Sequence, residues 1–138
     1  MITAIDVDSV RDYVCKADRS LPKEEQTVWK IGVIDSVTMA KLDQLDVEFN
    51  PDSEEAKVKA NLLGRELDYV RYGLKGFENF KDKSGVEIKP LMNTIARAGE
   101  SFQIISDKTL KRIPPDVIRE LAAAIKNDNK LSDAEIKN

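Results

Sequence analysis

The side chains that could do chemistry in this sequence are few, because the chain contains no histidine and only one cysteine. Without an imidazole, a Ser-His-Asp triad and other histidine-dependent mechanisms are excluded, and so is a Cys/His zinc site within one chain. No imidazole is present to activate Cys15, which favours an inert thiol over a nucleophile. A lone cysteine forms no internal disulfide, which is typical of a reducing compartment.

Carboxylate groups are numerous, but their spacing matches no catalytic or metal-binding pattern. With 25 acidic residues, close pairs such as Asp6 and Asp8 arise by chance. The spacing Asp6-x-Asp8-x-x-x-Asp12 lacks the glycine and the terminal glutamate of a calcium loop. The glycines do not cluster, so the sequence has neither a P-loop nor a dinucleotide fingerprint. We therefore predict no catalytic residue, no cofactor, no metal site and no enzymatic activity.

Charge is nearly balanced, with 22 basic and 25 acidic side chains and a net charge of −3. The two signs are interleaved, which argues against binding to nucleic acid because that function needs a basic surface. The cluster of Lys108, Lys111 and Arg112 is more typical of a solvated surface than of a phosphate site. The run from Asp43 to Glu55, acidic with no Lys or Arg, also indicates a solvated surface.

The sequence predicts no association with a membrane. No stretch reaches the roughly 20 apolar residues that a spanning helix requires. The N-terminal residues 1–6 lack the basic flank and the apolar run of a signal peptide. We expect a soluble protein that stays in the cytoplasm, or in something assembled there.

The clearest structural pattern is a helix that follows Asn50-Pro51, with Asp52 as its N-cap and Glu55 three residues later. Its apolar positions are spaced four and three residues apart, which places them on one stripe. These positions are Ala56, Ala60, Leu63, Leu67, Val70 and Leu74. Gly76 is suited to end this helix in a left-handed conformation. The stripe either packs on the rest of the domain or forms a seam for a partner helix.

Three aromatic side chains are the best further candidates for recognition. Trp29 lies in the stretch 26–34, whose Thr, Val, Trp and Ile residues predict a β-strand. Phe77 and Phe80 follow the predicted helix directly. Aromatic side chains often anchor interfaces, but with only eight aromatic residues in the chain the core needs some of them. Interface and core therefore remain alternatives for all three.

The remaining segments complete the expected fold. A short helix capped near Asp6 or Asp8, a helix from Asp35-Ser36 to about Asp46, and a small hairpin or ordered loop at 77–88 are predicted. Residues 90–105 have helical spacing that Gly99 interrupts. Ser106-Asp107 caps a single turn, and a helix begins at Ile113-Pro114-Pro115 and ends at residues 127–129, followed by a short helix or tail.

These elements predict an α+β, mainly helical single domain with a small β-strand and hairpin component. It divides into an N-terminal strand and helix part (1–50), the long amphipathic helix (51–76), and the turn or hairpin with C-terminal helices (77–138). The predicted protein-binding residues belong to the helix stripe and to the aromatic group. They are Leu63, Leu67, Val70, Leu74, Phe77, Phe80 and Trp29.

The segment from Gly76 to Ile88 resembles a pattern found in small tailed-bacteriophage proteins. A helix ends at glycine, an aromatic residue follows (here Phe77 where Trp is more usual), and an acidic-glycine turn comes next. Later pieces of the chain are similar as well. These are Ile113-Pro114-Pro115, the helix through Ile125, Leu131-Ser132 and the final Lys137-Asn138. Such arrangements occur in tail assembly chaperones, so the C-terminal part of the chain resembles that family.

The resemblance implies a non-enzymatic protein-binding factor in virion assembly. Its partners would be phage proteins of the tape-measure or tail-tube type, or the chain itself, in the host cytoplasm during assembly. A tail assembly chaperone is thought to keep apolar tape-measure segments soluble, which calls for an amphipathic helix or groove, a charged surface and no catalytic centre. The alternatives are a small structural subunit of the head, neck or tail that stays in the virion, or a phage-encoded inhibitor of a host protein. A DNA-binding regulator ranks last, because the final helices lack a basic recognition face.

Overall fold

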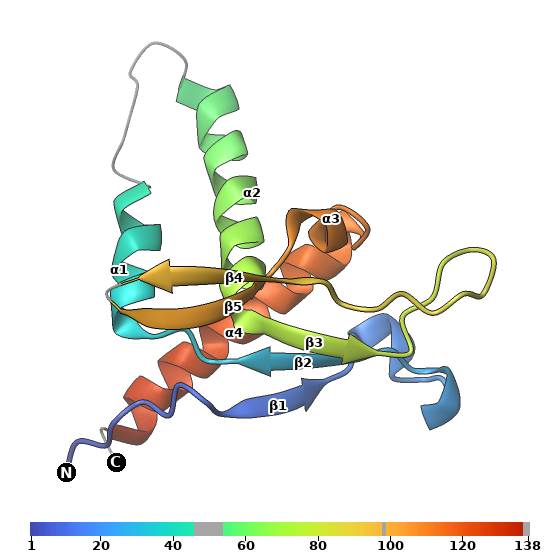
Figure 1. Cartoon of the computed structure of the whole chain (residues 1–138), viewed down its shortest axis with the longest axis horizontal. Helices are drawn as coiled ribbons and strands as arrows, with labels where there is room; N and C mark the ends of the chain where they lie inside the picture. The colour runs from blue at the N-terminus through green and yellow to red at the C-terminus, as the bar shows by residue number, and fades with distance from the viewer. Residues whose placement is uncertain (46–53, 98, 137–138) are drawn as a thin grey trace.

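The computed structural model describes residues 1–45, 54–97 and 99–136 of the chain (Figure 1). Within these ranges four α-helices, two short 3-10 helices and five β-strands are present. In chain order they are β1 (Val10–Tyr13), η1 (Lys16–Asp18), η2 (Lys23–Glu25), β2 (Val28–Gly32), α1 (Ser36–Leu45), α2 (Glu54–Gly73), β3 (Leu74–Glu78), β4 (Met92–Arg97), β5 (Glu100–Ile105), α3 (Asp107–Leu110) and α4 (Pro115–Ile136). The fold is therefore α+β, but the prediction of a mainly helical domain is wrong. Residues 10–13, 92–97 and 100–105 form strands, and the five strands of the described residues build two antiparallel sheets.

The first sheet has the strand order β1-β2-β3, with both pairs antiparallel. The predicted strand at 26–34 is confirmed as β2, the central strand, and a register shift between Lys30 and Ile31 distorts its pairing with β3. Helix α4 runs behind this sheet in Figure 1 and packs against both α2 and β2. The face of the sheet toward α4 supplies the buried Trp29 and Ile31, so the core lies between the sheet and the two long helices.

The N-terminal residues form a strand where a helix was expected. Val10 pairs with Gly32, and Tyr13 pairs with Trp29. Two long-range contacts stabilise this arrangement: the Arg11 guanidinium donates to both carboxylate oxygens of Asp128 in α4, at 2.6 and 3.0 Å. Because backbone pairing and these contacts come from residues distant in the sequence, the local capping signals at Asp6 and Asp8 do not produce a helix.

Residues 92–105 form a β-hairpin, β4 and β5, and the interrupted helical spacing in this region does not give a helix. Gly99 has a φ of 79°, the left-handed conformation that lets the chain reverse direction here. Ile95 and Phe102 lie directly opposite each other across the hairpin. Two residues seven positions apart, such as Ile95 and Phe102, can lie on the same side of a helix or face each other across a hairpin. The spacing by itself therefore does not distinguish a helix from a hairpin. Ala98, which belonged to the same pattern, lies outside the described residues.

Helix α2 ends at Gly73, three residues before the predicted Gly76, and the prediction that Gly76 ends it is wrong. Leu74 is the first residue of β3, and Gly76 lies inside that strand. The strand follows the helix without an intervening loop. At this point Gly73 lies against Ile125 of α4, where a side chain at position 73 would not fit. The predicted N-cap of α2, Asp52, lies outside the described residues.

Helix α4 continues to Ile136, although residues 127–129 were expected to end it. The polar side chains in this segment bond to other elements and not to their own backbone. Asn129 Oδ1 accepts a hydrogen bond from Ile34 N at 3.3 Å, and Asn129 Nδ2 donates one to Ile34 O at 2.9 Å. Asp128 forms an ion pair with Arg11. These partners satisfy the side chains that would otherwise compete with the helix.

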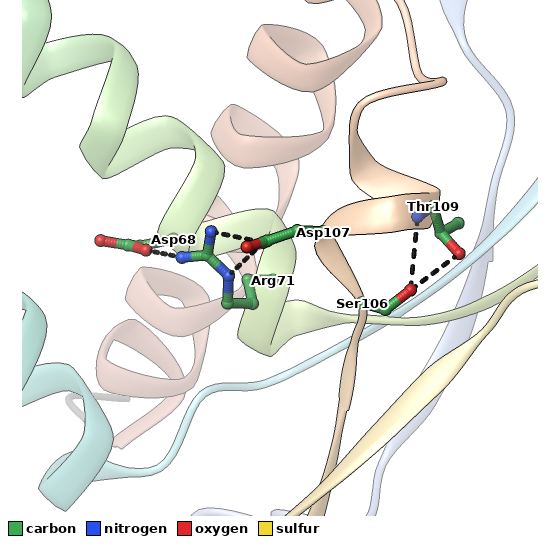
Figure 2. Close-up of polar contacts among 5 residues, drawn as sticks. All are labelled: Asp68, Arg71, Ser106, Asp107 and Thr109. Atoms are coloured by element: carbon green, nitrogen blue, oxygen red, sulfur yellow. Dashed lines mark hydrogen bonds and ion pairs between the residues drawn. The ribbon is translucent and has the colours of Figure 1, made fainter.

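The short helix α3 confirms the predicted cap at Ser106. The Ser106 hydroxyl accepts a bond from Thr109 N, and the two hydroxyl oxygens lie 3.2 Å apart (Figure 2). The Arg71 guanidinium of α2 bonds Asp68 on its own helix and Asp107 on α3, the latter at 2.9 Å. The Arg71–Asp107 contact fixes α3 beside the C-terminal end of α2. The expected small hairpin or ordered loop at 77–88 begins later, at Asn79, because residues 77 and 78 belong to β3. The bond from Ile88 N to Phe80 O and a single antiparallel bridge between Lys81 and Glu87 close it.

Candidate functional site

The structure places most of the predicted protein-binding residues in the interior. Val70 and Leu74 are completely buried, and Trp29 and Phe77 are only 2% and 7% exposed. Leu67 and Phe80 are partly buried and pack against this core. Leu63 lies in α2, but its side chain is outside the part of the structure that is described. Among the members whose side chains are described, Val70, Leu74, Trp29 and Phe77 therefore serve packing, with Leu67 and Phe80 at the edge of the same core.

The three aromatic residues form one compact cluster. Their ring centroids lie 5.4 Å apart for Trp29 and Phe77, 5.1 Å for Trp29 and Phe80, and 5.3 Å for Phe77 and Phe80. The inclined, edge-to-face arrangements are those that aromatic pairs prefer. The cluster joins β2 to the end of β3 and stabilises the first sheet.

Three exposed apolar side chains, Val7, Val10 and Phe102, gather around a groove between the first sheet and the β4–β5 hairpin. This groove, which we call the β5 groove, has a volume of about 380 Å³. Its lining comes from β1 and the segment before it, the residues that follow β2, the last turn of α2, the start of β3 and the hairpin. The lining residues are Val7, Asp8, Val10, Val33, Ile34, Asp35, Tyr72, Lys75, Met92, Ile95, Ser101, Phe102, Gln103 and Ile104. Val7, Val10 and Phe102 are 49%, 48% and 37% exposed, which leaves apolar surface open at its rim.

The main chain of β5 borders the groove, since four consecutive residues, 101–104, line it. Strand β5 pairs with β4 on one side, and no described strand pairs with its other side. Ser106 N donates to Leu91 O at 2.9 Å in the continuation of the β4–β5 ladder. Hydrogen-bonding direction alternates along an antiparallel strand, so the N–H and C=O groups of Ser101 and Gln103 point away from β4. The β5 groove thus combines unpaired strand-edge groups with exposed apolar side chains.

Lys75 forms part of the groove floor. Its side chain crosses Gly32, where a Cβ would stand 3.0 Å from Lys75 Cε, and its Nζ donates to Tyr72 O at 2.8 Å. Burial lowers the pKa of the Lys75 amine, and the charges of Asp35 and Asp8 oppose that change. The two carboxylates and the ammonium keep one end of an otherwise apolar groove polar.

Asp35 has a structural role at that polar end. Its carboxylate accepts bonds from Thr38 N and from the Thr38 hydroxyl, both at 2.8 Å, and so caps α1. Burial alone would raise the pKa of Asp35, but these hydrogen bonds outweigh burial and lower it. Asp35 is therefore committed to the helix cap, and it is not placed as a general base.

The described residues hold no cluster of three or more His, Cys, Asp or Glu side chains that could bind a metal ion. In the same part of the chain, no helix combines the length and apolar character needed to cross a membrane. The chain matches no protein-family model, no curated protein and no solved structure in the comparisons made.

Sequence reasoning missed Val10, Ile95 and Phe102 as candidate surface residues. The available signal was the combination of Gly99 with the β-prone residues on either side of it, which indicates a hairpin. The groove itself could not be inferred from that signal, because it forms between segments far apart in the sequence.

Proposed function

We propose that this chain is a non-enzymatic protein-binding factor whose β5 groove receives an extended apolar segment of another protein. The observation that carries this proposal is the unpaired edge of β5 beside exposed Val10 and Phe102. Strand addition to a sheet edge supplies main-chain hydrogen bonds, while alternate side chains enter apolar pockets. Both components are present along the same four residues of β5.

The dimensions fit a short strand. Four residues of an extended chain span about 13 Å, so the groove accommodates a segment of similar length. Alternate side chains of that segment would face Val10, Ile95 and Phe102, and the remaining ones would face solvent. An alternating apolar and polar sequence is therefore the expected ligand.

We further propose that this binding serves tailed-phage virion assembly in the host cytoplasm, in the manner of a tail assembly chaperone. The support is the resemblance of the segment from Gly76 to the C-terminus, together with a groove suited to apolar segments such as those of a tape-measure protein. A balanced, highly charged surface favours solubility of such a complex. A structural subunit of the virion would use the same groove, but would remain in the particle.

The strand-addition step is tested with a synthetic eight-residue peptide in which valine and threonine alternate. The control is a scrambled peptide in which the valines form one block and the threonines another. Amide hydrogen exchange of the intact chain is measured with each peptide. We expect the alternating peptide to slow exchange at Ser101 and Gln103, whose N–H groups point away from β4. Exchange at Phe102 and Ile104 should change much less, because their N–H groups already bond β4. Equal protection by both peptides, or none at these positions, would contradict strand addition.

Two variants separate the main-chain and side-chain contributions. Gln103→Pro removes a groove-facing N–H and spares the β4–β5 ladder, a position where a strand edge tolerates proline. Phe102→Ser removes apolar surface, and its matched control is Leu21→Ser, which is similarly exposed at 39% but lies outside the groove. We expect at least a tenfold loss of affinity for both groove variants and unchanged binding for Leu21→Ser, with circular dichroism used to verify folding.

The assembly role is tested by mass spectrometry of purified particles from the phage that encodes the chain. A chaperone should be absent from the particles and abundant in the infected-cell lysate. The tape-measure protein should then be soluble only when it is co-expressed with this chain. Presence in stoichiometric amount would favour the structural subunit instead. An insoluble tape-measure protein despite co-expression would contradict the chaperone role.

A further inference from the structure

A second hollow lies between α3 and the loop that follows β3, on residues that do not line the β5 groove. Its volume is about 420 Å³. Val86, Ile88 and Leu91 give it apolar walls, and Val86 and Leu91 are 62% and 51% exposed. We call this hollow the basic pocket, because of the cations that surround it.

Four cationic side chains line the basic pocket: Lys89, Lys108, Lys111 and Arg112. Within the described ranges of the chain, none of the four forms an ion pair or a side-chain hydrogen bond. Cations held this close together repel one another, so a site of this kind is stabilised by an anionic partner.

Two carboxylates, Asp82 and Glu87, also line the basic pocket and offset part of its positive charge, although they accept hydrogen bonds from backbone N–H groups. Asp82 Oδ1 accepts bonds from Ser84 N and Val86 N, at 2.8 and 3.0 Å, inside its own loop. Glu87 Oε1 accepts from Asn79 N at 3.3 Å. Asp107 faces the other way, toward Arg71 (Figure 2). With four cations and two carboxylates in its lining, the basic pocket is locally positive, although the whole chain carries a net charge of −3.

The same chain contains a stretch of complementary chemistry. Residues 43–55 include six carboxylates and no basic residue. Three apolar side chains are interleaved with them at Leu45, Val47 and Phe49. An acidic stretch with apolar side chains matches an apolar pocket with a cationic rim, in both charge and hydrophobic character.

This stretch cannot reach the basic pocket of its own molecule. It joins α1 to the N-terminal end of α2, whereas α3 is held at the C-terminal end of α2 through Arg71. Glu54 and Arg71 are about 26 Å apart along the helix axis. The connection from Leu45 to Glu54, fixed at both ends, extends at most about 16 Å outward and back. If residues 43–55 enter a basic pocket, that pocket therefore belongs to another copy.

We propose that the basic pocket binds the acidic stretch, residues 43–55, of a second copy of this chain. The stretch and the pocket lie at opposite ends of α2, so each molecule offers one donor and one acceptor. Such an interface is heterologous and joins molecules head to tail. Because charge complementarity drives the contact and the cations are exposed, association weakens as salt screens the charges.

The test is sedimentation velocity of the full chain at 50 and 500 mM NaCl over a range of protein concentrations. We expect the average mass to rise with concentration at low salt and to fall to the monomer at high salt. A chain that remains monomeric at 50 mM NaCl up to millimolar concentration would overturn the proposal.

Charge reversal locates the contact. The double variant Lys108→Glu/Lys111→Glu should lower the association constant at 50 mM NaCl by at least tenfold. Its control, Lys23→Glu/Lys126→Glu, changes the net charge equally at exposed positions away from the basic pocket and should associate as the wild type does. Equal association of both double variants would overturn the proposal, since net charge alone would then be responsible.

Mixing complementary variants distinguishes this contact from other modes of self-association. The variant Asp46→Lys/Glu48→Lys carries a reversed acidic stretch and should be monomeric by itself. Mixed with Lys108→Glu/Lys111→Glu, it should recover association, because the reversed stretch then faces a reversed pocket. Failure of the mixture to associate, while circular dichroism shows both variants folded, would contradict the assignment of the two surfaces to each other.

Discussion

Gly73, the last residue of α2, lies so close to Ile125 of α4 that a Cβ at position 73 would stand 2.7 Å from two of its side-chain carbons. Ile125 is completely buried. The contact lets α2 and α4 approach at the point where α2 turns into β3. The missing side chain of Gly73 therefore permits close packing of α2 on α4 at the residue where the helix is followed directly by β3.

Gly73→Ala should destabilise the protein by about 2 kcal/mol, because the added methyl group overpacks a filled core. Gly64→Ala is the matched control, since it changes another glycine of the same helix where nothing lies within 4 Å. It should stabilise by about 0.5–1 kcal/mol, as expected for alanine in a helix. Urea denaturation at pH 7 measures both values. A Gly73→Ala protein as stable as Gly64→Ala would show that the contact is loose.

Asn79 joins the end of β3 to the segment before β2, and we expect stability to fall from the wild type to Asn79→Gly and further to Asn79→Ala. It has a φ of 59°, and its side-chain amide donates to Glu24 O and Gln26 O at 3.0 and 3.1 Å. Asn79→Gly loses these bonds but adopts the left-handed conformation freely, so we expect a loss of about 1 kcal/mol. Asn79→Ala adds backbone strain and should lose about 2 kcal/mol. Thermal unfolding that ranks alanine at or above glycine would contradict this account.

Cys15 should be almost unreactive in the folded protein. It is 6% exposed, and burial, followed by the charges of Glu120 and Asp18, raises the pKa of its thiol to about 12. At pH 8 the thiolate fraction is then on the order of 10³-fold smaller than for an unperturbed cysteine. A colorimetric disulfide reagent should react at least that much more slowly in buffer than in 6 M guanidinium chloride. Rapid modification of the folded chain would show that the segment around Cys15 opens readily.

Stability should fall at alkaline pH, with Tyr13 as one cause. Burial, and then the 2.7 Å hydrogen bond to Glu120 Oε2, raise the pKa of Tyr13 from 10.0 to about 12. Between these values the unfolded chain has lost the phenolic proton and the folded chain has kept it. The unfolded state therefore binds fewer protons, and the free energy of unfolding decreases as pH rises from 10 to 12.

The urea midpoint at pH 9, 10 and 11.5 measures this effect. Tyr13→Phe has no phenolic proton to lose and should show a shallower decline across the same range. The decline that remains should start lower, near pH 9, because the raised pKa of Cys15 contributes there. Parallel pH profiles for the wild type and Tyr13→Phe would mean that Tyr13 does not lose its proton on unfolding in this range.

Some parts of this fold follow from local sequence alone. The Ser106 cap of α3, the start of α4 near Pro114-Pro115 and the strand β2 were predicted correctly, because each depends on residues within a few positions of one another. Pro, Ser and β-branched residues restrict the backbone wherever they occur. Periodicity likewise placed Val70 and Leu74 on a buried side of the chain.

Other parts were decided only by tertiary structure. Strand β1 depends on pairing with β2 and on the ion pair between Arg11 and Asp128, which are 117 residues apart. The end of α2 depends on Ile125, and the buried aromatic cluster and the β5 groove depend on which strands become neighbours. Periodicity identifies an apolar face, but it does not say whether that face meets the core or a partner. Here the core takes Leu67, Val70 and Leu74 of the predicted stripe and the three aromatics, because the sheet and α4 close over them. Part of the apolar surface left open belongs to a hairpin whose sequence also fitted a helix.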